Sequence, residues 1–134
     1  MKAQDVKLGD ALPPLTKPPI TTRQLVQYAG ACGDFNPIHY DDPFARAGGY
    51  PSVIAHGMLS MGFFGQLVTT WAGPGAVERI SARFKAVTFP GDVITCTGEV
   101  VEKDEAARTA VIKLIAKNQA GAVTLEGSAT IKLD

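Results

Sequence analysis

The chain has 134 residues, 46% of them hydrophobic, and its 13 basic residues balance its 13 acidic ones. This length and apolar content suit a single domain over residues 1–134 that buries a core of its own. Because the net charge is zero, the sequence lacks the broad positive field that binding to nucleic acid or an anionic membrane exploits, so we expect neither partner.

The first predicted elements are a proline-rich extended segment and a helix. Residues 8–20 hold four prolines, so any strand there is short or at a sheet edge. A helix is expected after Thr21, which has a glutamine three residues later as in a capping box, and Ile20 and Leu25 are spaced as a hydrophobic staple. Gly33 suits the left-handed residue that closes a helix. The apolar residues at helical spacing are Leu25, Tyr28, Ala29 and Cys32.

Two further helical segments follow. In DDPFARAGGYP, Asp42 before Pro43 is the expected cap of a short helix. The segment HGMLSMGFFGQLVTTW, residues 56–71, carries apolar residues around most of a helical circumference. A helix of this kind is surrounded by protein, because no face of it suits water.

The periodicity changes from helical to two after the break AGPGA at 72–76. Strands are predicted at about 79–86, 93–102, 109–117 and 123–133, and the short turns between them imply an antiparallel meander. The predicted inward residues are Ile80, Ala82, Phe84, Ala86, Ala110, Ile112, Leu114, Ala116, Val123, Leu125, Gly127, Ala129, Ile131 and Leu133. We expect an α+β fold with an antiparallel sheet wrapped around one long apolar helix. Since such a sheet covers only one side of the helix, a second copy is expected to complete the assembly.

The sequence also carries information on the compartment. Cys32 and Cys96 fall within the predicted helix and a predicted strand, without the dense disulfide framework of a small secreted protein. The first ten residues lack the apolar core of a signal peptide. The uncharged stretch 47–77 is interrupted by Gly, Pro, His and Ser, so its unbroken apolar part is shorter than the ~20 residues of a membrane span. We therefore expect a cytoplasmic protein with reduced thiols.

The stretch GDFNPIH, residues 33–39, places Asp34 five positions before His39. Neither a helix nor a strand brings side chains at this spacing to one face. A turn at Asn36 and Pro37 does, because the residue before proline leaves the helical region and asparagine bonds to nearby backbone. A carboxylate and an imidazole brought together in this way can hold a water molecule, one accepting a proton while the other gives or orients.

The second candidate element is HGM, residues 56–58, at the start of the apolar helix. Helix N-termini leave N–H groups unpaired, and Gly57 lets a ligand oxygen approach them. Beside Asp34 and His39, this donor completes a base, an acid and an enolate stabiliser for adding water across an activated double bond. His56 is expected to cap the helix or to position the backbone, and Ser60 to bond back to its own helix.

Ordinary interpretations stay open for each of these residues. An aspartate after a helix is commonly a turn former, a lone histidine is commonly a surface or core residue, and Asp41 and Asp42 suit helix caps. The pattern His39-x-Asp41 followed by His56 also imitates the two-histidine, one-carboxylate site of non-haem iron enzymes. Those sites lie among the strands of a jelly roll, whereas a long apolar helix follows here, so we predict no metal.

The run GDFNPIHYDDPFARAGGYPSVIAHGML resembles the hydratase motif of the MaoC-like, (R)-specific enoyl-CoA hydratases and the related (3R)-hydroxyacyl-ACP dehydratase subunits. The resemblance implies a hot-dog fold over nearly the whole chain and reversible hydration of trans-2-enoyl thioesters to (3R)-3-hydroxyacyl thioesters. It implies that Asp34 and His39 activate the water, that Asn36 shapes the turn, and that the amide of Gly57 binds the thioester carbonyl. No metal or redox cofactor is implied, and CoA or phosphopantetheine enters only as part of the substrate. Members of the family commonly form dimers.

Several alternatives remain within this resemblance. Arg83 and Lys85 are expected to meet CoA phosphates or an acidic carrier protein, or else to belong to an ordinary solvated strand face. A homodimer is expected, with a heterodimer possible. A subunit active only beside a different chain, and a thioesterase on the same scaffold, are the alternative functions. The motif D-x-N-P-x-H disfavours the thioesterase.

Overall fold

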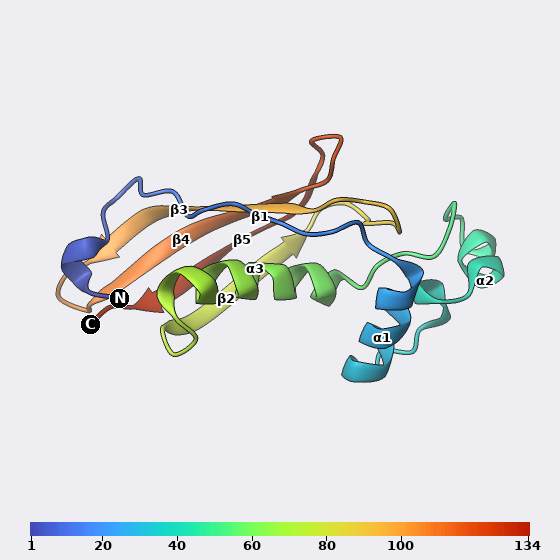
Figure 1. The fold of residues 1–134 in the computed structure, drawn as a ribbon, viewed down its shortest axis with the longest axis horizontal. Coiled ribbons are helices and arrows are strands. Elements are labelled where there is room, and N and C mark those ends of the chain that lie inside the picture. The colour runs from blue at the N-terminus through green and yellow to red at the C-terminus, as the bar shows by residue number, and fades with distance from the viewer.

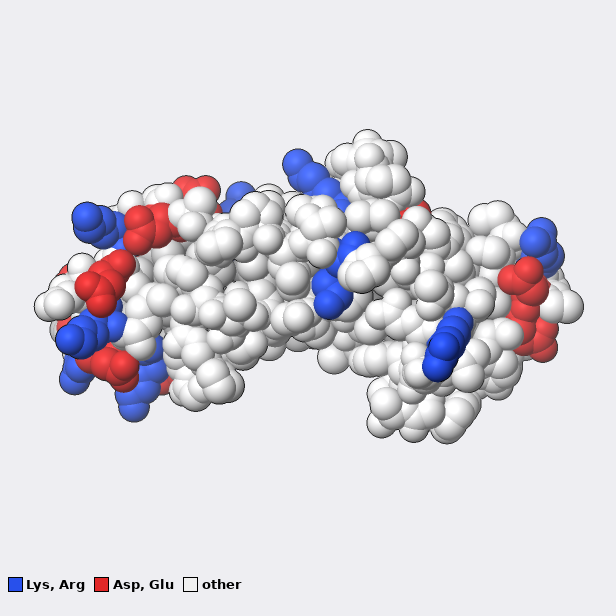
Figure 2. Space-filling view, in the orientation of Figure 1, with Lys and Arg blue, Asp and Glu red and all other residues white.

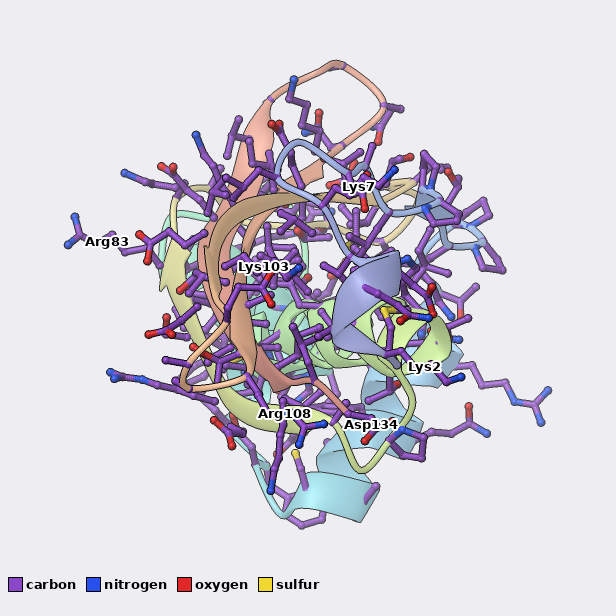
Figure 3. All side chains as sticks on the ribbon, turned by 90° about the vertical axis from the view of Figure 1, so that its left-hand side faces the viewer. Lys2, Lys7, Arg83, Lys103, Arg108 and Asp134 are labelled. Atoms are coloured by element: carbon purple, nitrogen blue, oxygen red, sulfur yellow. The ribbon has the colours of Figure 1, made fainter.

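The computed structural model describes residues 1–134, and a five-stranded antiparallel sheet forms its frame. The strands lie side by side in the order β1-β3-β4-β5-β2. Their bounds are β1 Leu15–Thr16, β2 Val77–Phe84, β3 Thr95–Asp104, β4 Thr109–Lys117 and β5 Val123–Lys132. The long helix α3, Gly57–Ala72, lies along one face of this sheet (Figure 1), and the end-on view of Figure 3 shows the sheet curving around it.

The shorter helices gather beyond one end of the sheet. These are α1 (Thr22–Cys32), a 3-10 turn (Pro37–His39) and α2 (Asp42–Ala47), and Figure 1 shows them next to the N-terminal end of α3. A further 3-10 turn, Ala3–Asp5, lies near the chain termini at the other end. The start of α3 therefore points toward the segment that carries the candidate site.

The boundaries of α1 follow the sequence prediction. The Thr21 hydroxyl accepts a hydrogen bond from the N–H of Gln24 at 3.1 Å, which satisfies one of the unpaired donors of the first turn. Ile20 and Leu25 are both buried, as a hydrophobic staple requires. Gly33 ends the helix with a φ of 76°, a left-handed conformation that glycine adopts without strain. The predicted cap and stop of this helix are confirmed.

The core forms one cluster of 24 buried residues, most of them on α3 and on the inner face of the sheet. The inward residues of β4 that the alternation predicts are all buried, namely Ala110, Ile112, Leu114 and Ala116. From α3 the side chains that pack against them include Phe63, Phe64, Leu67 and Val68. No helix is long and apolar enough to cross a lipid bilayer.

The strand order differs from the predicted meander. β3, β4 and β5 do follow one another, but β2 pairs with β5, so the prediction that β2 neighbours β3 is wrong. The segment 85–94 carries the chain across the end of the sheet, where the Ala55 N–H donates to the Thr88 carbonyl at 2.8 Å. The free edge of β3 is instead taken by the short β1, which is an edge strand as its prolines predict.

A burial prediction at the end of β2 is corrected. Phe84 was expected to point into the core but is 56% exposed, because it ends an edge strand and its ring lies against the start of α3. The sheet covers one side of α3, as the sequence analysis expects, and Met58 and Gln66 of this helix are exposed in the single chain, so its covering by a second copy stays a prediction. A single curved sheet has too little surface to enclose a helix completely.

Two local predictions are also corrected. The cap of α2 is Asp41, whose carboxylate accepts from the Phe44 N–H at 3.2 Å, and Asp42 is the first helical residue. The shift arises because Asp42 is used elsewhere, accepting from the Val53 N–H at 2.9 Å. Cys32 is exposed, since it is the last residue of α1 and lies past the part of the helix that packs on the core.

Candidate active site

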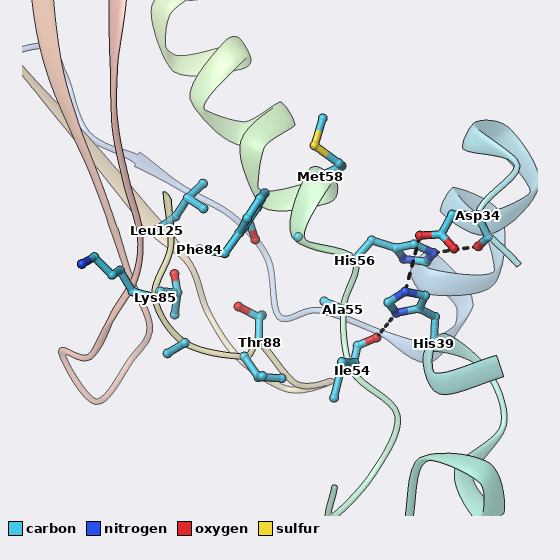
Figure 4. Close-up of a pocket in the computed structure, with 15 residues that line it drawn as sticks. Asp34, His39, Ile54, Ala55, His56, Met58, Phe84, Lys85, Thr88 and Leu125 are labelled. Carbon is cyan, nitrogen blue, oxygen red and sulfur yellow. Dashed lines mark hydrogen bonds and ion pairs between the residues drawn. The ribbon is translucent and has the colours of Figure 1, made fainter. Parts of the chain in front are cut away.

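The loop after α1 brings Asp34 and His39 together. One carboxylate oxygen of Asp34 accepts from the Asn36 N–H at 3.2 Å, and the Asn36 side chain accepts from the Ile38 N–H at 3.2 Å. These two local bonds reverse the chain, and Pro37 begins the 3-10 turn that carries His39. As a result, Oδ2 of Asp34 lies 3.6 Å from Nε2 of His39 (Figure 4).

A second contact fixes the tautomer of His39. Its Nδ1 lies 2.7 Å from the carbonyl oxygen of Ile54, and a carbonyl oxygen only accepts, so Nδ1 carries the hydrogen. In the neutral ring, Nε2 then keeps its lone pair and faces Asp34. His39 is 6% exposed, whereas the Asp34 side chain is 54% exposed. The pair thus combines a fixed imidazole with an accessible carboxylate.

His56 completes the group, although it does not cap α3 with its side chain. Its Nε2 lies 3.1 Å from the main-chain carbonyl oxygen of Asp34, and its ring stacks on the ring of His39 with centroids 3.6 Å apart. Burial lowers the pKa of His56 below its ordinary value, and the nearby His39 lowers it further, while the hydrogen bond to Asp34 acts in the opposite direction. The neutral ring is therefore favoured.

Gly57 begins α3 immediately beside these groups. The N–H groups of Gly57 and Met58 have no acceptor within the chain, as expected for the first turn of a helix. A Cβ atom at Gly57 would lie 2.6 Å from Cε1 of Phe84, so the ring occupies the space that a side chain would need. The start of α3 thus has no side chain at Gly57, and its first two residues, whose N–H groups are free, line the same pocket as Asp34 and His39.

These residues open onto a pocket of about 440 Å³. Its walls come from the loop after α1, the start of α3, the segment after β2 and the start of β5 (Figure 4). The lining residues are Asp34, His39, Ile54, Ala55, His56, Gly57, Met58, Ser60, Phe84, Lys85, Ala86, Val87, Thr88, Thr124 and Leu125. The pocket joins an apolar interior to a polar end that holds the carboxylate, the imidazole and the helix N-terminus.

Ser60 is a site residue that the sequence reasoning missed. The Ser60 hydroxyl does not form the expected hydrogen bond to a carbonyl of its own helix, as the Thr69 hydroxyl does, and Ser60 lines the pocket. The available signal was its position three residues after Gly57, which puts it on the same face of α3. Helical side chains also lean toward the N-terminus, so its hydroxyl lies over the first turn.

Only one of the two candidate phosphate contacts lines the pocket. Lys85 lines the pocket and pairs with Glu126 at 3.0 Å. Arg83 is absent from the pocket lining, and Figure 3 shows it pointing outward from the sheet, away from α3. Arg83 borders a separate polar hollow, which Lys85 and Lys113 also line.

The acidic residue that lies beside the two histidines is not the one in the iron-site pattern His39-x-Asp41. Asp41 caps α2, and the acidic residue that meets both histidines is Asp34, with ligand atoms of the three residues within 4.8 Å of one another. The rings of His39 and His56 are stacked with an interplanar angle of 20°. Ring-nitrogen lone pairs lie in the ring plane, so on stacked rings they run side by side and do not converge on one ion.

Comparison with known proteins identifies the family of the chain. The family description "MaoC like domain" matches residues 7–121. The chain belongs to the MaoC-like domain family. The match includes the whole motif from Asp34 to Gly57 and the strands β1 to β4, and it ends just before β5.

Individual relatives of this MaoC-like chain include hydratases. An (R)-specific enoyl-CoA hydratase of Rhodospirillum rubrum is 34% identical over 96% of the chain and 88% of that enzyme. The enoyl-CoA hydratase ChsH3 of Mycobacterium tuberculosis is 35% identical over 81% of the chain, which spans only 37% of that longer protein. The solved (R)-hydratase of Aeromonas caviae superposes with a TM-score of 0.90 at 30% identity, over 98% of the chain and 100% of that structure. The expected hot-dog fold is confirmed.

Proposed function

We propose that the chain catalyses the reversible hydration of trans-2-enoyl thioesters to (3R)-3-hydroxyacyl thioesters. The observation that carries this proposal is the approach of the Asp34 carboxylate to within 3.6 Å of Nε2 of His39, at a pocket that also contains the bare start of α3. The names of the relatives from R. rubrum and A. caviae support it, because both are (R)-specific enoyl-CoA hydratases.

The proposed chemistry uses three groups. Asp34 and His39 hold a water molecule between them, and the Nε2 lone pair of His39 faces that position because Nδ1 donates to Ile54. The water oxygen bonds to C3 of the enoyl group, the water gives one proton to the pair, and the pair returns one proton to C2. The pair is therefore unchanged after each turnover.

The thioester oxygen becomes negatively charged as the new C3–O bond forms. We assign its stabilisation to the N–H of Gly57, which has no acceptor in the chain and lies at the positive end of the α3 dipole. Asn36 and Pro37 shape the turn that holds the pair. The reaction adds water without oxidation or reduction, so the proposal requires no metal and no redox cofactor.

The substrate carrier is CoA or an acyl carrier protein, both of which present a phosphopantetheine thioester. Lys85, which directly follows β2, lies at the pocket wall and is the better-placed candidate for a phosphate contact, whereas Arg83 lies within β2 and outside the pocket lining. A phosphate there competes with Glu126 for the Lys85 ammonium group, since the two now pair at 3.0 Å.

We further propose that residues 1–134 form one catalytic domain and that two copies associate. The strand β2 is an edge of the sheet with eight residues, and unpaired strand edges are ready to pair with another strand. Met58 and Phe84 near this edge are 55% and 56% exposed, and the middle of the α3 face in Figure 2 carries few charged side chains. A second identical chain is the simplest partner for this surface.

The test is an enoyl-thioester panel of increasing chain length, starting with crotonyl-CoA and run with CoA and carrier-protein forms side by side. Asp34→Asn is expected to lower kcat by roughly 10²–10⁴-fold, the usual contribution of a general acid or base. Asp5→Asn, an exposed aspartate in the terminal 3-10 turn, is the matched control and keeps the wild-type rate. Wild-type turnover in Asp34→Asn would refute the assignment.

The same experiment separates the alternatives. Activity of the chain expressed alone excludes a subunit that works only beside a different chain, and light scattering measures whether the active species is a dimer. Release of a free thiol without a hydroxyacyl product would instead identify a thioesterase.

A further inference from the structure

His56 is the one residue that contacts every part of the proposed catalytic group. It precedes Gly57 in the chain, its Nε2 donates to the Asp34 carbonyl at 3.1 Å, and its ring stacks on that of His39. The edge of Tyr28 from α1 packs against the same ring, with centroids 4.8 Å apart. A single buried side chain thus joins α1, the loop after it and the start of α3.

The hydrogen bonding of the His56 ring indicates a role beyond packing. Because its Nε2 carries the hydrogen that Asp34 accepts, Nδ1 of the neutral ring is an acceptor, and this atom is buried without any partner. An unpaired buried acceptor destabilises the fold. A phenylalanine would fill nearly the same space without that defect, so the polar ring requires another reason.

We propose that His56 is a positioning residue, which sets the separation between Asp34 and His39 mainly through its hydrogen bond to Asp34 and to a smaller extent through its ring contact with His39. The hydrogen bond holds the Asp34 main chain, and the stacked ring limits how far the His39 ring can tilt. Its peptide link to Gly57 ties this pair to the N–H that receives the thioester oxygen. The kinetic consequence rests on the proposed hydratase function.

This role requires a neutral His56. Protonation would add a second N–H at a buried position without an acceptor and would put a cation against the stacked ring of His39. The ionisable groups that face the ring are Asp34, His39 and Tyr28. Burial, the largest influence, lowers the pKa of His56 and so keeps the working form populated near neutral pH.

Two substitutions separate positioning from packing. His56→Phe keeps an aromatic ring and removes the donor, while His56→Gln carries an amide N–H to about the position of Nε2 and removes the ring. We expect His56→Phe to lower kcat about 30-fold with KM within threefold of wild type and with no fall in Tm. His56→Gln is expected to retain at least one fifth of the wild-type kcat.

Other outcomes of the same measurements would overturn the proposal. A kcat of His56→Phe within threefold of wild type overturns the proposal. So does a parallel loss of Tm and kcat in both variants, which is the signature of a structural role. If His56→Phe does not fold, a His56→Gln chain with wild-type Tm and at least one fifth of the activity supports the hydrogen bond, and a smaller kcat overturns it.

A spectroscopic test is independent of activity. The chain has two histidines, so ¹⁵N spectra of the rings contain only His39 and His56, and one variant assigns both. At pH 7 to 8 we expect His56 in the Nε2–H form and His39 in the Nδ1–H form. An Nδ1–H or doubly protonated His56 overturns the proposal even in an active enzyme, whereas the expected forms in a chain without hydratase activity reject only the proposed function.

Discussion

Replacing Gly57 by alanine adds one methyl group at the first residue of α3. The backbone of Gly57 is outside the left-handed region, so alanine adopts it without strain. The added Cβ would lie 2.6 Å from Cε1 and 2.8 Å from Cδ1 of Phe84, where ordinary contacts begin at 3.4 Å. The difference, 3.4 minus 2.6, requires the Phe84 ring to move by about 0.8 Å.

The cost of this movement in stability is small. Phe84 is 56% exposed, so its ring moves outward into solvent and the backbone stays in place. Overpacking at such a site costs about 1 kcal/mol, the low end of its usual range. The higher helix propensity of alanine returns up to ~1 kcal/mol, so the free energy of unfolding stays nearly constant.

The cost in activity is much larger. The displaced ring and the new methyl group both border the N–H that we assign to the thioester oxygen. A misplacement of about 1 Å at a reacting group lowers rates by ~10²-fold, and loss of one oxyanion donor by ~10²–10³-fold. Gly57→Ala is therefore expected to lower kcat for crotonyl-CoA hydration about 100-fold, with an unchanged Tm in thermal unfolding.

A double-mutant cycle identifies the cause. In a Phe84→Ala background there is no ring to displace, so adding Gly57→Ala is expected to lower kcat by less than about threefold relative to Phe84→Ala alone. A Gly57→Ala enzyme within threefold of the wild-type kcat would refute the claim that the added methyl group and the displaced ring disturb this donor. An equal loss in both backgrounds would refute the steric explanation through Phe84.

The remaining predictions concern stability, thiol reactivity and pH. Gly127→Ala places a Cβ against a main-chain carbonyl of the neighbouring strand and should lower the free energy of unfolding in urea by about 3 kcal/mol. Gly30 is exposed on α1 with open space around it, so Gly30→Ala should raise the same free energy by roughly 0.5–1 kcal/mol. Equal effects of the two substitutions would contradict this prediction. A thiol reagent should modify the exposed Cys32 at once. It should modify Cys96 only after unfolding, because this thiol is buried and its pKa is raised to about 11. Two labels on the native chain would disprove the burial of Cys96. Because the pKa of His56 is lowered below 6.5, the folded chain binds fewer protons than the unfolded chain as the pH falls. The contribution of His56 to the free energy of unfolding is therefore complete above pH 6.5 and declines at lower pH. His56→Phe should remove this part of the pH dependence, and identical urea midpoints at every pH in both chains would contradict the prediction.

Features set by short-range interactions were predictable from the sequence. The cap and stop of α1 depend on side chains within three or four residues, so Thr21 and Gly33 indicate them directly. The reversal at Asn36 and Pro37 is equally local, which is why a five-residue spacing was enough to predict that Asp34 and His39 meet. The inward residues of β4 follow from alternation alone.

Contacts between distant residues required the tertiary structure. The hydrogen bond from His56 to Asp34 joins positions 22 apart, and nothing in the sequence near either residue indicates it. The pairing of β2 with β5, and with it the position of Phe84 against Gly57, depends on how the chain crosses the end of the sheet. Local sequence determined which chemical groups this protein carries and how each turn is made. The packing of α3 on the sheet decided which of these groups share a pocket. Only long-range burial of apolar surface selects among the many ways of arranging the same local elements.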